Sequence, residues 1–207
     1  MKIKMLICSL AAAAMLPVSA AEKPANYVLQ EGFENVKMNN KGILYCPYIY
    51  PTTKLTEGRE YNYIRGKREV GEGKFSLKMV NLQDKGVYFL MCDKVIPVCK
   101  KDEYFVLSAD VRGKGVVQLA LVNYTGKNKF INTTGGAPLN GKPGISLKKP
   151  LESEEWTTVY FKCPRTAKAT DDGICKMAIF IYAKSEVYVD NIKIWTEKTG
   201  AAPAKSK

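Results

Sequence analysis

The sequence contains no histidine and only two tryptophans among its 207 residues. The absence of histidine excludes Ser-His-Asp triads, His-ligated metal centres and histidine general bases. Chemistry that needs only two carboxylates stays open, and the close acidic pairs are Glu31/Glu34, Glu154/Glu155 and Asp171/Asp172. The last two pairs fall in expected turns, where solvated surface explains them. Because the sequence also lacks a nucleophile elbow, a phosphate-binding loop and a paired metal motif, we expect a protein that is not an enzyme.

Beyond the N-terminus, the sequence lacks an apolar run of the roughly 20 residues that a membrane span needs. The early apolar run, residues 5–16, follows Lys2 and Lys4 and precedes Val18-Ser19-Ala20. This is the pattern of a secretory signal peptide cut after Ala20 or Ala21. We therefore predict a bacterial protein that is secreted or periplasmic, with residues 1–20 as its signal peptide and no membrane span.

Acidic residues are the minority: the chain has 32 Lys and Arg against 20 Asp and Glu. Removal of residues 1–20 takes away two lysines and no acid, which leaves 30 against 20, a net charge of +10. The lysines are scattered through turns and strand ends, so they are either ordinary solvated surface or an attraction for an acidic surface or polymer. Nucleic acid is excluded as a partner, because the chain is expected to be exported and has no basic recognition helix.

Cysteines are few but present, and none has the CxxC spacing of a metal or redox site. Five remain after residue 20, and disulfides are plausible in an exported protein. A bridge between Cys163 and Cys175 would fix the base of the loop between them, and Cys92 and Cys99 flank another connection. Cys46 would then be the odd thiol, although sequence alone does not determine connectivity.

Short alternating or apolar runs separated by Gly, Pro, Asn and Asp fill the chain from Tyr27 to Trp195. Their enrichment in β-branched and aromatic residues favours strands over helices. In one of them, Phe105, Leu107, Ala109 and Val111 alternate with polar residues, which indicates one core face and one polar face. The expected strands are residues 42–50, 60–66, 74–81, 86–93, 103–113, 115–124, 128–134, 155–163, 175–183 and 186–195.

The number of expected strands predicts an all-β fold: one two-sheet jelly-roll β-sandwich domain over residues 21–196. No internal repeat is visible. The remaining residues, 197–207, are rich in Ala, Lys and Pro and have nothing to bury. We expect them to form a disordered tail.

Five short motifs occur in one order along the chain: "EGFEN" (31–35), "GEGKFSLKM" (71–79), "YFVLSADVRGKG" (104–115), "EWTTVYFKCP" (155–164) and "VYVDNIKIW" (187–195). In this order they resemble the jelly-roll carbohydrate-binding modules attached to bacterial cellulases and xylanases, within the wider galactose-binding-like superfamily. The resemblance covers nearly the whole chain after residue 20.

The resemblance also implies a structural calcium ion. Such an ion would explain why a carboxylate, Asp190, occurs in an otherwise apolar strand. It assigns Glu34 and Asp190 as side-chain ligands, with Glu31 as a further contributor. Carbonyl ligands would come from residues 73–76, namely Gly73, Lys74 and Ser76. Calcium takes several oxygen ligands of these kinds. The alternatives for Asp190 are a salt bridge to a lysine, or a turn in which it bonds its own backbone beside Asn191.

Such modules hold sugars across aromatic rings on a concave sheet, because a pyranose has an apolar C–H face and hydroxyls that need polar partners. The chain has twelve tyrosines. Trp156 and Trp195 are expected to pack structurally. The candidate ligand-binding residues are Tyr45, Tyr48, Tyr50, Tyr61, Tyr63, Arg112, Gln118, Tyr124 and Tyr182.

These expectations combine into a secreted, non-catalytic module that binds a polysaccharide or cell-surface glycan, with its enzyme partner encoded separately. The net charge of +10 favours an acidic polysaccharide such as a uronate or sulfated glycan. One alternative is a structural or adhesive envelope protein with the same fold and no sugar binding. The other is a small glycoside hydrolase.

Overall fold

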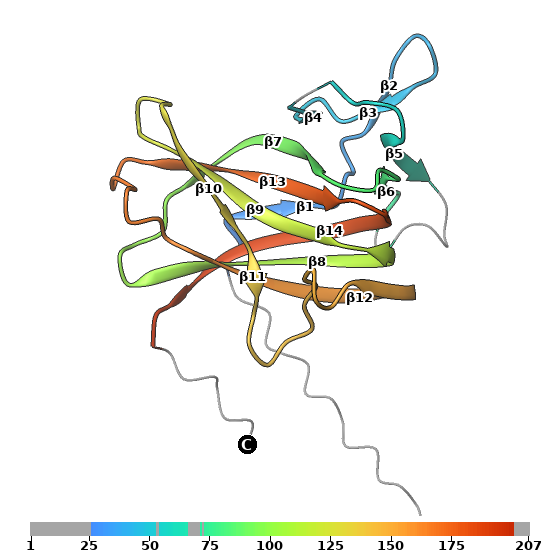
Figure 1. The fold of residues 1–207 in the computed structure, drawn as a ribbon. Helices are drawn as coiled ribbons and strands as arrows, with labels where there is room; N and C mark the ends of the chain where they lie inside the picture. Colours follow the sequence, from blue (N-terminus) through green and yellow to red (C-terminus); the bar gives the residue numbers. More distant parts are fainter. Residues whose placement is uncertain (1–25, 53, 66–70, 72, 201–207) are drawn as a thin grey trace, which may run out of the picture.

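The computed structural model of the chain describes residues 26–52, 54–65, 71 and 73–200. The predicted signal peptide, residues 1–20, lies outside these residues. The described part consists of strands, turns and loops (Figure 1), and it contains no helix long and apolar enough to cross a membrane.

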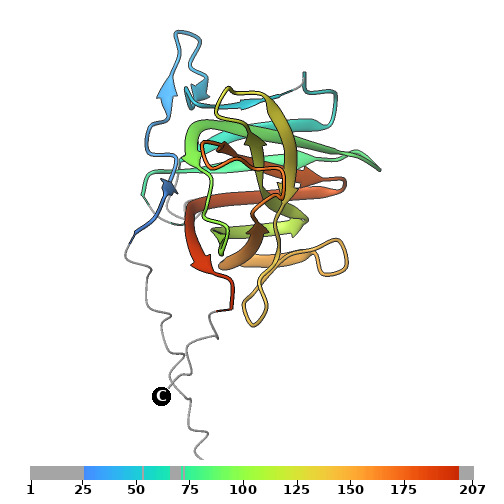
Figure 2. The same ribbon diagram turned by 90° about the vertical axis from the view of Figure 1, so that its left-hand side faces the viewer.

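Two antiparallel sheets form the body of the protein, which confirms the expected all-β sandwich. The seven-stranded sheet has the order β11 (Ala137–Pro138), β12 (Leu151–Pro164), β8 (Glu103–Gly115), β14 (Ser185–Lys198), β6 (Phe75–Asn81) and β5 (Arg59–Arg65), with β1 (Leu29–Glu31) beside β14. The five-stranded sheet has the order β10 (Phe130–Gly135), β9 (Val117–Tyr124), β13 (Ile174–Tyr182), β7 (Val87–Pro97) and β4 (Ile49–Pro51). A small hairpin of β2 (Lys37–Met38) and β3 (Leu44–Tyr45) projects from one end of the sandwich (Figures 1 and 2).

The core lies between the two sheets because alternate side chains of each strand point inward. On β8 the predicted inner residues Phe105, Leu107, Ala109 and Val111 are all buried. Strand β13 supplies the facing layer from the other sheet. Its inward residues, each no more than 1% exposed, are Cys175, Met177, Ile179 and Ile181.

Residues 42–50 differ from the single strand expected there. They contain β3 and the start of β4, separated by a turn in which the Ile49 N–H donates to the Cys46 carbonyl at 3.3 Å. Pro47 lies inside this turn and has no N–H with which to continue a ladder. The break separates the tyrosines of this segment onto different parts of the molecule.

The last strand is longer than expected, and the boundary of the predicted tail at residue 197 is two residues too early. Glu197 and Lys198 belong to β14, where they pair with Tyr104 and Glu103 of β8. The Glu197 carboxylate accepts hydrogen bonds from the Tyr104 hydroxyl at 2.7 Å and from the Trp195 indole N–H at 3.0 Å. These side-chain bonds stabilise the polar end of β14. The apolar pattern of the sequence does not predict this end, because its residues are polar.

The expected disulfides are absent: Cys46, Cys92, Cys99, Cys163 and Cys175 are all buried free thiols. Three of the thiols donate instead to nearby oxygens. Cys175 Sγ donates to Asn123 Oδ1 at 3.2 Å, Cys99 Sγ to the Glu103 carbonyl at 3.5 Å, and Cys163 Sγ to the Thr134 carbonyl at 3.6 Å. Burial raises the pKa of both Cys163 and Cys175 to about 12.

The first prediction follows from these thiols. Denatured, unreduced protein beginning at residue 21 should show five reactive thiols in a colorimetric assay. Native protein should react slowly, because burial and a raised pKa keep the reactive thiolate scarce. Intact mass before and after reduction provides the control. A thiol count of three or one, together with a mass that rises on reduction, would contradict the structure.

Candidate functional site

The outer face of the five-stranded sheet is apolar, although it lies away from the main core. A second cluster of buried residues, separate from the main core, forms on this face. Half-buried rings pack against it, and polar side chains stand at its two ends. We call this surface the sheet platform; it consists of Tyr50, Phe89, Met91, Asp93, Gln118, Ala120, Val122, Tyr124, Lys176, Ala178, Phe180 and Tyr182.

Strand register brings the platform residues into rows across the sheet. One row runs from Gln118 on β9 through Phe180 on β13 to Phe89 on β7. The next row runs from Ala120 through Ala178 and Met91 to Tyr50 on β4. Ala120 and Ala178 in this second row have short side chains, so the centre of the platform lies below the larger side chains around it.

Aromatic rings form the raised part of the platform. Phe89 and Phe180 stack with ring centroids 4.6 Å apart and planes 19° apart. Tyr124 lies at the β9–β10 end, where Phe130 packs edge-on against it at 6.1 Å. The Tyr124 hydroxyl contacts Met91 Sδ at 3.8 Å, so this ring also leans over the buried floor.

Hydrogen-bonding groups flank the rings at one end. Asp93 forms an ion pair with Lys176 and accepts a hydrogen bond from the Tyr50 hydroxyl at 3.5 Å. The hydrogen bond to Asp93 raises the pKa of Lys176, so the ammonium stays charged at neutral pH. Burial, followed by the charge of Asp93, raises the pKa of Tyr50 and keeps its hydroxyl protonated.

A second polar group stands at the opposite end. The Tyr182 hydroxyl donates to Gln118 Oε1 at 2.9 Å, and Gln118 Nε2 donates to the Gly136 carbonyl at 2.9 Å. Gln118 is thereby held in one orientation on the strand. The platform therefore presents an apolar, partly aromatic centre between two sets of positioned polar groups.

Four of the nine expected ligand-binding residues lie on the platform: Tyr50, Gln118, Tyr124 and Tyr182. The others do not. Tyr45 is exposed on β3, Tyr48 lies under Lys94 with the ammonium 4.3 Å from its ring, Tyr61 packs against the main core, and Tyr63 is 3% exposed within it. Arg112 lies on the seven-stranded sheet. The expected cluster from Tyr45 to Tyr63 is therefore dispersed by the turn at Pro47 and by the separation of β4 and β5 into different sheets.

Sequence reasoning missed Phe89, Met91 and Phe180, as well as the Asp93–Lys176 pair. A signal for the apolar residues exists in the sequence. In "CKMAIFIYA" and "GVYFLMCD" both alternating sets of residues are largely apolar, whereas a strand with a solvated outer face alternates apolar with polar. The ion pair crosses an irregularity in the β7–β13 register, which no periodic pattern predicts.

The expected calcium ligands form a separate group at the other sheet. Asp190 is fully buried at a register irregularity in β14; its Oδ2 accepts from the Gly71 N–H at 2.9 Å and its Oδ1 from the Asn191 N–H at 2.7 Å. The second bond joins Asp190 to its own backbone beside Asn191, as in the alternative considered for this aspartate, and Asn191 has a positive φ of 48°. Glu34 Oε1 accepts from the Lys74 N–H at 2.7 Å, so both carboxylates face the segment that contains Gly71 and residues 73–74.

Gly73 is constrained in this segment. Its φ is +78°, and a side-chain carbon added there would lie 2.0 Å from Glu34 Oε1. Ser76 is fully buried at the start of β6. Among the described residues, no group of three or more Asp, Glu, His or Cys side chains is placed to hold a metal, so an ion here would need main-chain oxygens as well. Residues 66–70 and 72 of this region lie outside the described part.

Glu31, the further calcium ligand considered, has other partners. Its carboxylate is buried, accepts from the Phe33 N–H at 2.7 Å and the Tyr48 hydroxyl at 3.2 Å, and pairs with Lys94 at 2.8 Å. An ammonium at this distance already neutralises the carboxylate. Glu31 therefore links the end of β1 to Tyr48 and to Lys94 of β7.

Comparison with known proteins supports the fold. No protein-family model and no curated protein matches the chain. Among solved structures, the CBM22-1–GH10 modules of Clostridium thermocellum endo-1,4-β-D-xylanase 10B, complexed with xylohexaose, match with a TM-score of 0.51 at 14% identity over 87% of this chain and 30% of that chain. The CBM22-1–CBM22-2 tandem domain of Paenibacillus barcinonensis Xyn10C matches with a TM-score of 0.50 at 12% identity over 91% of this chain and 50% of that chain.

A cyclase from Fischerella sp. TAU also matches, with a TM-score of 0.50 at 15% identity over 83% of this chain and 96% of that chain. The protein therefore has the jelly-roll β-sandwich fold that is also found in these carbohydrate-binding modules. Because a cyclase shares this fold, the fold alone does not determine the function. The function has to be inferred from the geometry of the site.

The second prediction tests the inner and outer faces of β13 through two neighbouring residues. Ile179→Ala should lower the free energy of unfolding by about 2–5 kcal/mol, because Ile179 lies in the closed core. Phe180→Ala should cost only about 1–2 kcal/mol, because Phe180 is half-buried and stacks on the outer face. Urea denaturation measures both. Equal losses would mean that Phe180 is a core residue and that the platform is not a surface.

Proposed function

We propose that the protein is a non-catalytic module that binds a polysaccharide chain along the sheet platform. The observation that carries this proposal is the apolar outer face of the five-stranded sheet, with its half-buried aromatic rings. Rings of this kind stack on the apolar C–H face of a sugar, and flanking polar groups bond its hydroxyls. Export, as residues 1–20 predict, would bring the protein to a polysaccharide or cell-surface glycan on which a separately encoded enzyme acts.

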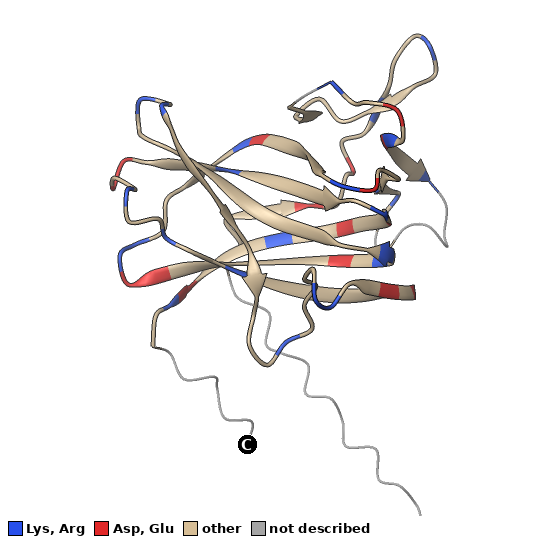
Figure 3. Cartoon of the chain, viewed as in Figure 1, with Lys and Arg blue, Asp and Glu red and all other residues tan. Residues whose placement is uncertain are grey.

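The charge of the platform favours a neutral glycan. Its described charged residues are Asp93 and Lys176, which form an ion pair with each other. Strands β9 and β13 are largely free of charged residues, whereas many lysines and arginines lie in loops (Figure 3). The acidic glycan suggested by the net charge would have to be attracted from those loops, and salt would weaken that attraction.

The same charges argue against hydrolysis on the platform. The usual mechanism of glycoside cleavage needs two carboxyl groups on either side of the scissile bond. Among the described residues, Asp93 is the single carboxylate of the platform, and it is already bound to Lys176 and Tyr50. This supports a binding role over the alternative of a small glycoside hydrolase.

The third prediction concerns glycan binding. In affinity electrophoresis the protein should be retarded by xylan or hydroxyethylcellulose, with little change at high salt, because stacking is not screened. Tyr50→Ala combined with Phe89→Ala should weaken retention at least about tenfold, since each ring loses buried contact area worth roughly 1.5–3 kcal/mol. Tyr45→Ala, which removes an exposed tyrosine away from the platform, is the matched control and should bind normally.

Two other results would change the conclusion. Retention by polygalacturonate alone, abolished by salt, would favour an acidic glycan held by the loop lysines. Retention by no glycan would favour a structural or adhesive envelope protein, whose apolar platform packs against another protein.

A bound calcium ion is a second proposal, carried by the convergence of Glu34 and Asp190 on one backbone segment. The two carboxylates and the carbonyls of Gly73, Lys74 and Ser76 would form an all-oxygen donor set of the kind that calcium prefers. The N–H groups of Gly71 and Lys74 already orient the two carboxylates. The ion would stabilise the seven-stranded sheet and would take no part in glycan chemistry.

The fourth prediction tests this ion. Removal of calcium with EDTA should lower the melting temperature by roughly 5–10 °C, if the ion is present near a hundred times its Kd. In Asp190→Asn, EDTA should have little further effect, because one of the two charged ligands is missing. Asp84→Asn, at an exposed ion pair with Lys184, is the control and should keep the full EDTA effect. Identical melting curves with and without EDTA in the unaltered protein would exclude the site.

A further inference from the structure

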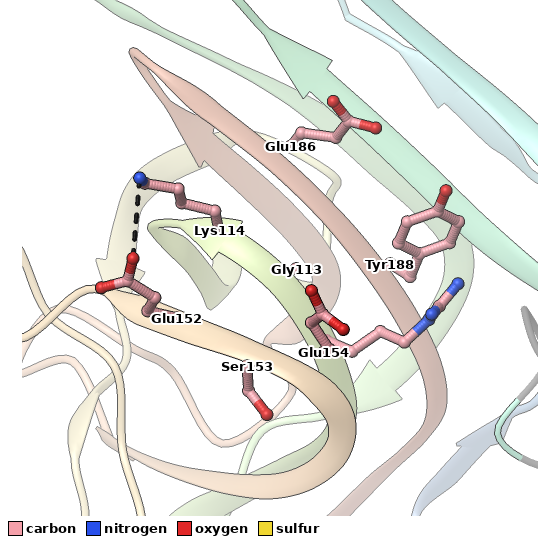
Figure 4. A pocket seen from close by; sticks show the side chains of 8 residues that line it. Gly113, Lys114, Glu152, Ser153, Glu154, Glu186 and Tyr188 are labelled. Carbon is pink, nitrogen blue, oxygen red and sulfur yellow. Dashed lines mark ion pairs between the residues drawn. The ribbon is translucent and has the colours of Figure 1, made fainter.

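A hollow lies on the other sheet, away from the platform. It opens on the outer face of the seven-stranded sheet and has a volume of about 400 Å³. Three neighbouring strands contribute to it: Gly113 and Lys114 come from β8, Glu152 to Glu154 from β12, and Glu186 and Tyr188 from β14 (Figure 4). Arg112 completes the lining. This volume lies within the range of about 300–1,000 Å³ that small-molecule sites occupy.

Two backbone features build the pocket. The register of β12 against β8 jumps between Ser153 and Thr157, so that residues 154–156 bulge opposite Arg112. Gly113 has a φ of +115°, and a side-chain carbon there would lie 2.3 Å from the Glu186 carbonyl oxygen. Only glycine fits this position, because a side chain there would collide with the β14 backbone, and its absence lets β8 and β14 approach closely beneath the pocket.

Arg112 is positioned before any ligand arrives. Its guanidinium carbon lies 4.2 Å from the centre of the Tyr188 ring and 5.6 Å from that of Trp156. Arg112 Nε and Trp156 Nε1 are buried, and neither has a hydrogen-bond partner among the described residues. The cation–π contact with Tyr188 therefore holds the guanidinium in place, while its hydrogen-bonding capacity is not fully used by the described residues.

The charges around the pocket balance. Lys78 pairs with Glu186 at 2.6 Å, and Lys114 pairs with Glu152 at 3.6 Å. This leaves Arg112 and Glu154, and no ion pair of the described residues includes either one. A free anion would be repelled by Glu154 and by two other carboxylates, Glu152 and Glu186. A cation would be repelled by Arg112. The described residues also form no metal-binding group here.

We propose that this pocket is a second binding site, and that it takes a neutral polyhydroxylated molecule of one or two sugar rings. Arg112 donates to the ligand and Glu154 accepts from its hydroxyls, so both charged groups gain hydrogen bonds without a net charge on the ligand. The Tyr188 hydroxyl supplies a third polar contact. The site lies on the sheet opposite the platform and is independent of the function proposed for that surface.

The experiment is a titration of isotope-labelled protein, followed by NMR, with D-xylose, D-glucose, D-galactose, xylobiose and cellobiose as probes. We expect at least one probe to shift the Gly113 amide and the Arg112 Nε–H resonance in a saturable manner. Glu154→Gln, at an exposed position, should weaken that binding about tenfold, and Arg112→Met should abolish it. Tyr50→Ala with Phe89→Ala should leave it unchanged, because those residues lie on the other sheet.

Two results would overturn the proposal. The first is that no probe shifts Gly113 or Arg112, even if a probe shifts platform residues such as Phe180. The second is that the shifts persist with the same affinity in Glu154→Gln. Because Glu154→Gln changes an exposed side chain, its result remains decisive even if Arg112→Met fails to fold. Loss of platform binding with the pocket shifts intact would count against the proposed function alone.

Discussion

The two-residue period of a β-strand is the constraint on which the rest of this structure depends. Each strand sends alternate side chains to opposite faces, so a strand can be apolar on one face or on both. In β8 the inner face is apolar and the outer face includes Asp110 and Arg112, as in most sandwich strands. In β13 both faces are apolar over most of the strand, and the second face becomes the platform. Strands with one apolar face contribute only to the core. Strands with two apolar faces also contribute to the surface that we propose binds a ligand.

Departures from this period coincide with the candidate sites. The β7–β13 register changes beside Lys176, next to the ion pair at the end of the platform. The β12–β8 register changes between Ser153 and Thr157, at the pocket of the seven-stranded sheet. The β14–β8 register changes between Asp190 and Lys193, at the buried carboxylate. An extra residue in one strand re-aims the side chains beside it, so polar groups reach positions that a regular ladder would not give them.

These irregularities also explain how much could be predicted from the sequence. The fold and the inner face of β8 follow from periodicity, whereas β7, β12 and β14 each extend several residues beyond the expected ranges. The expected residues Tyr50, Gln118, Tyr124 and Tyr182 lie on the platform because β4, β9 and β13 all belong to the five-stranded sheet. Phe89 and Phe180 were missed because phenylalanine in a strand suggests core, and the face of a strand is known only once its sheet is assembled. The disulfides were wrong because spacing along the chain does not reveal that Cys175 bonds Asn123.

The pairing of β1 with β14 places the two described ends of the chain side by side. The Val28 N–H donates to the Ile194 carbonyl at 2.8 Å, and the Tyr27 and Trp195 rings are in contact with centroids 5.9 Å apart. Both ends therefore leave the seven-stranded sheet beside each other at β1 and β14, while the platform belongs to the other sheet. A short linker between them would allow circular permutation, with new termini in an exposed loop. The same geometry would let the domain be inserted into a loop of a host protein, with the platform facing away from the host.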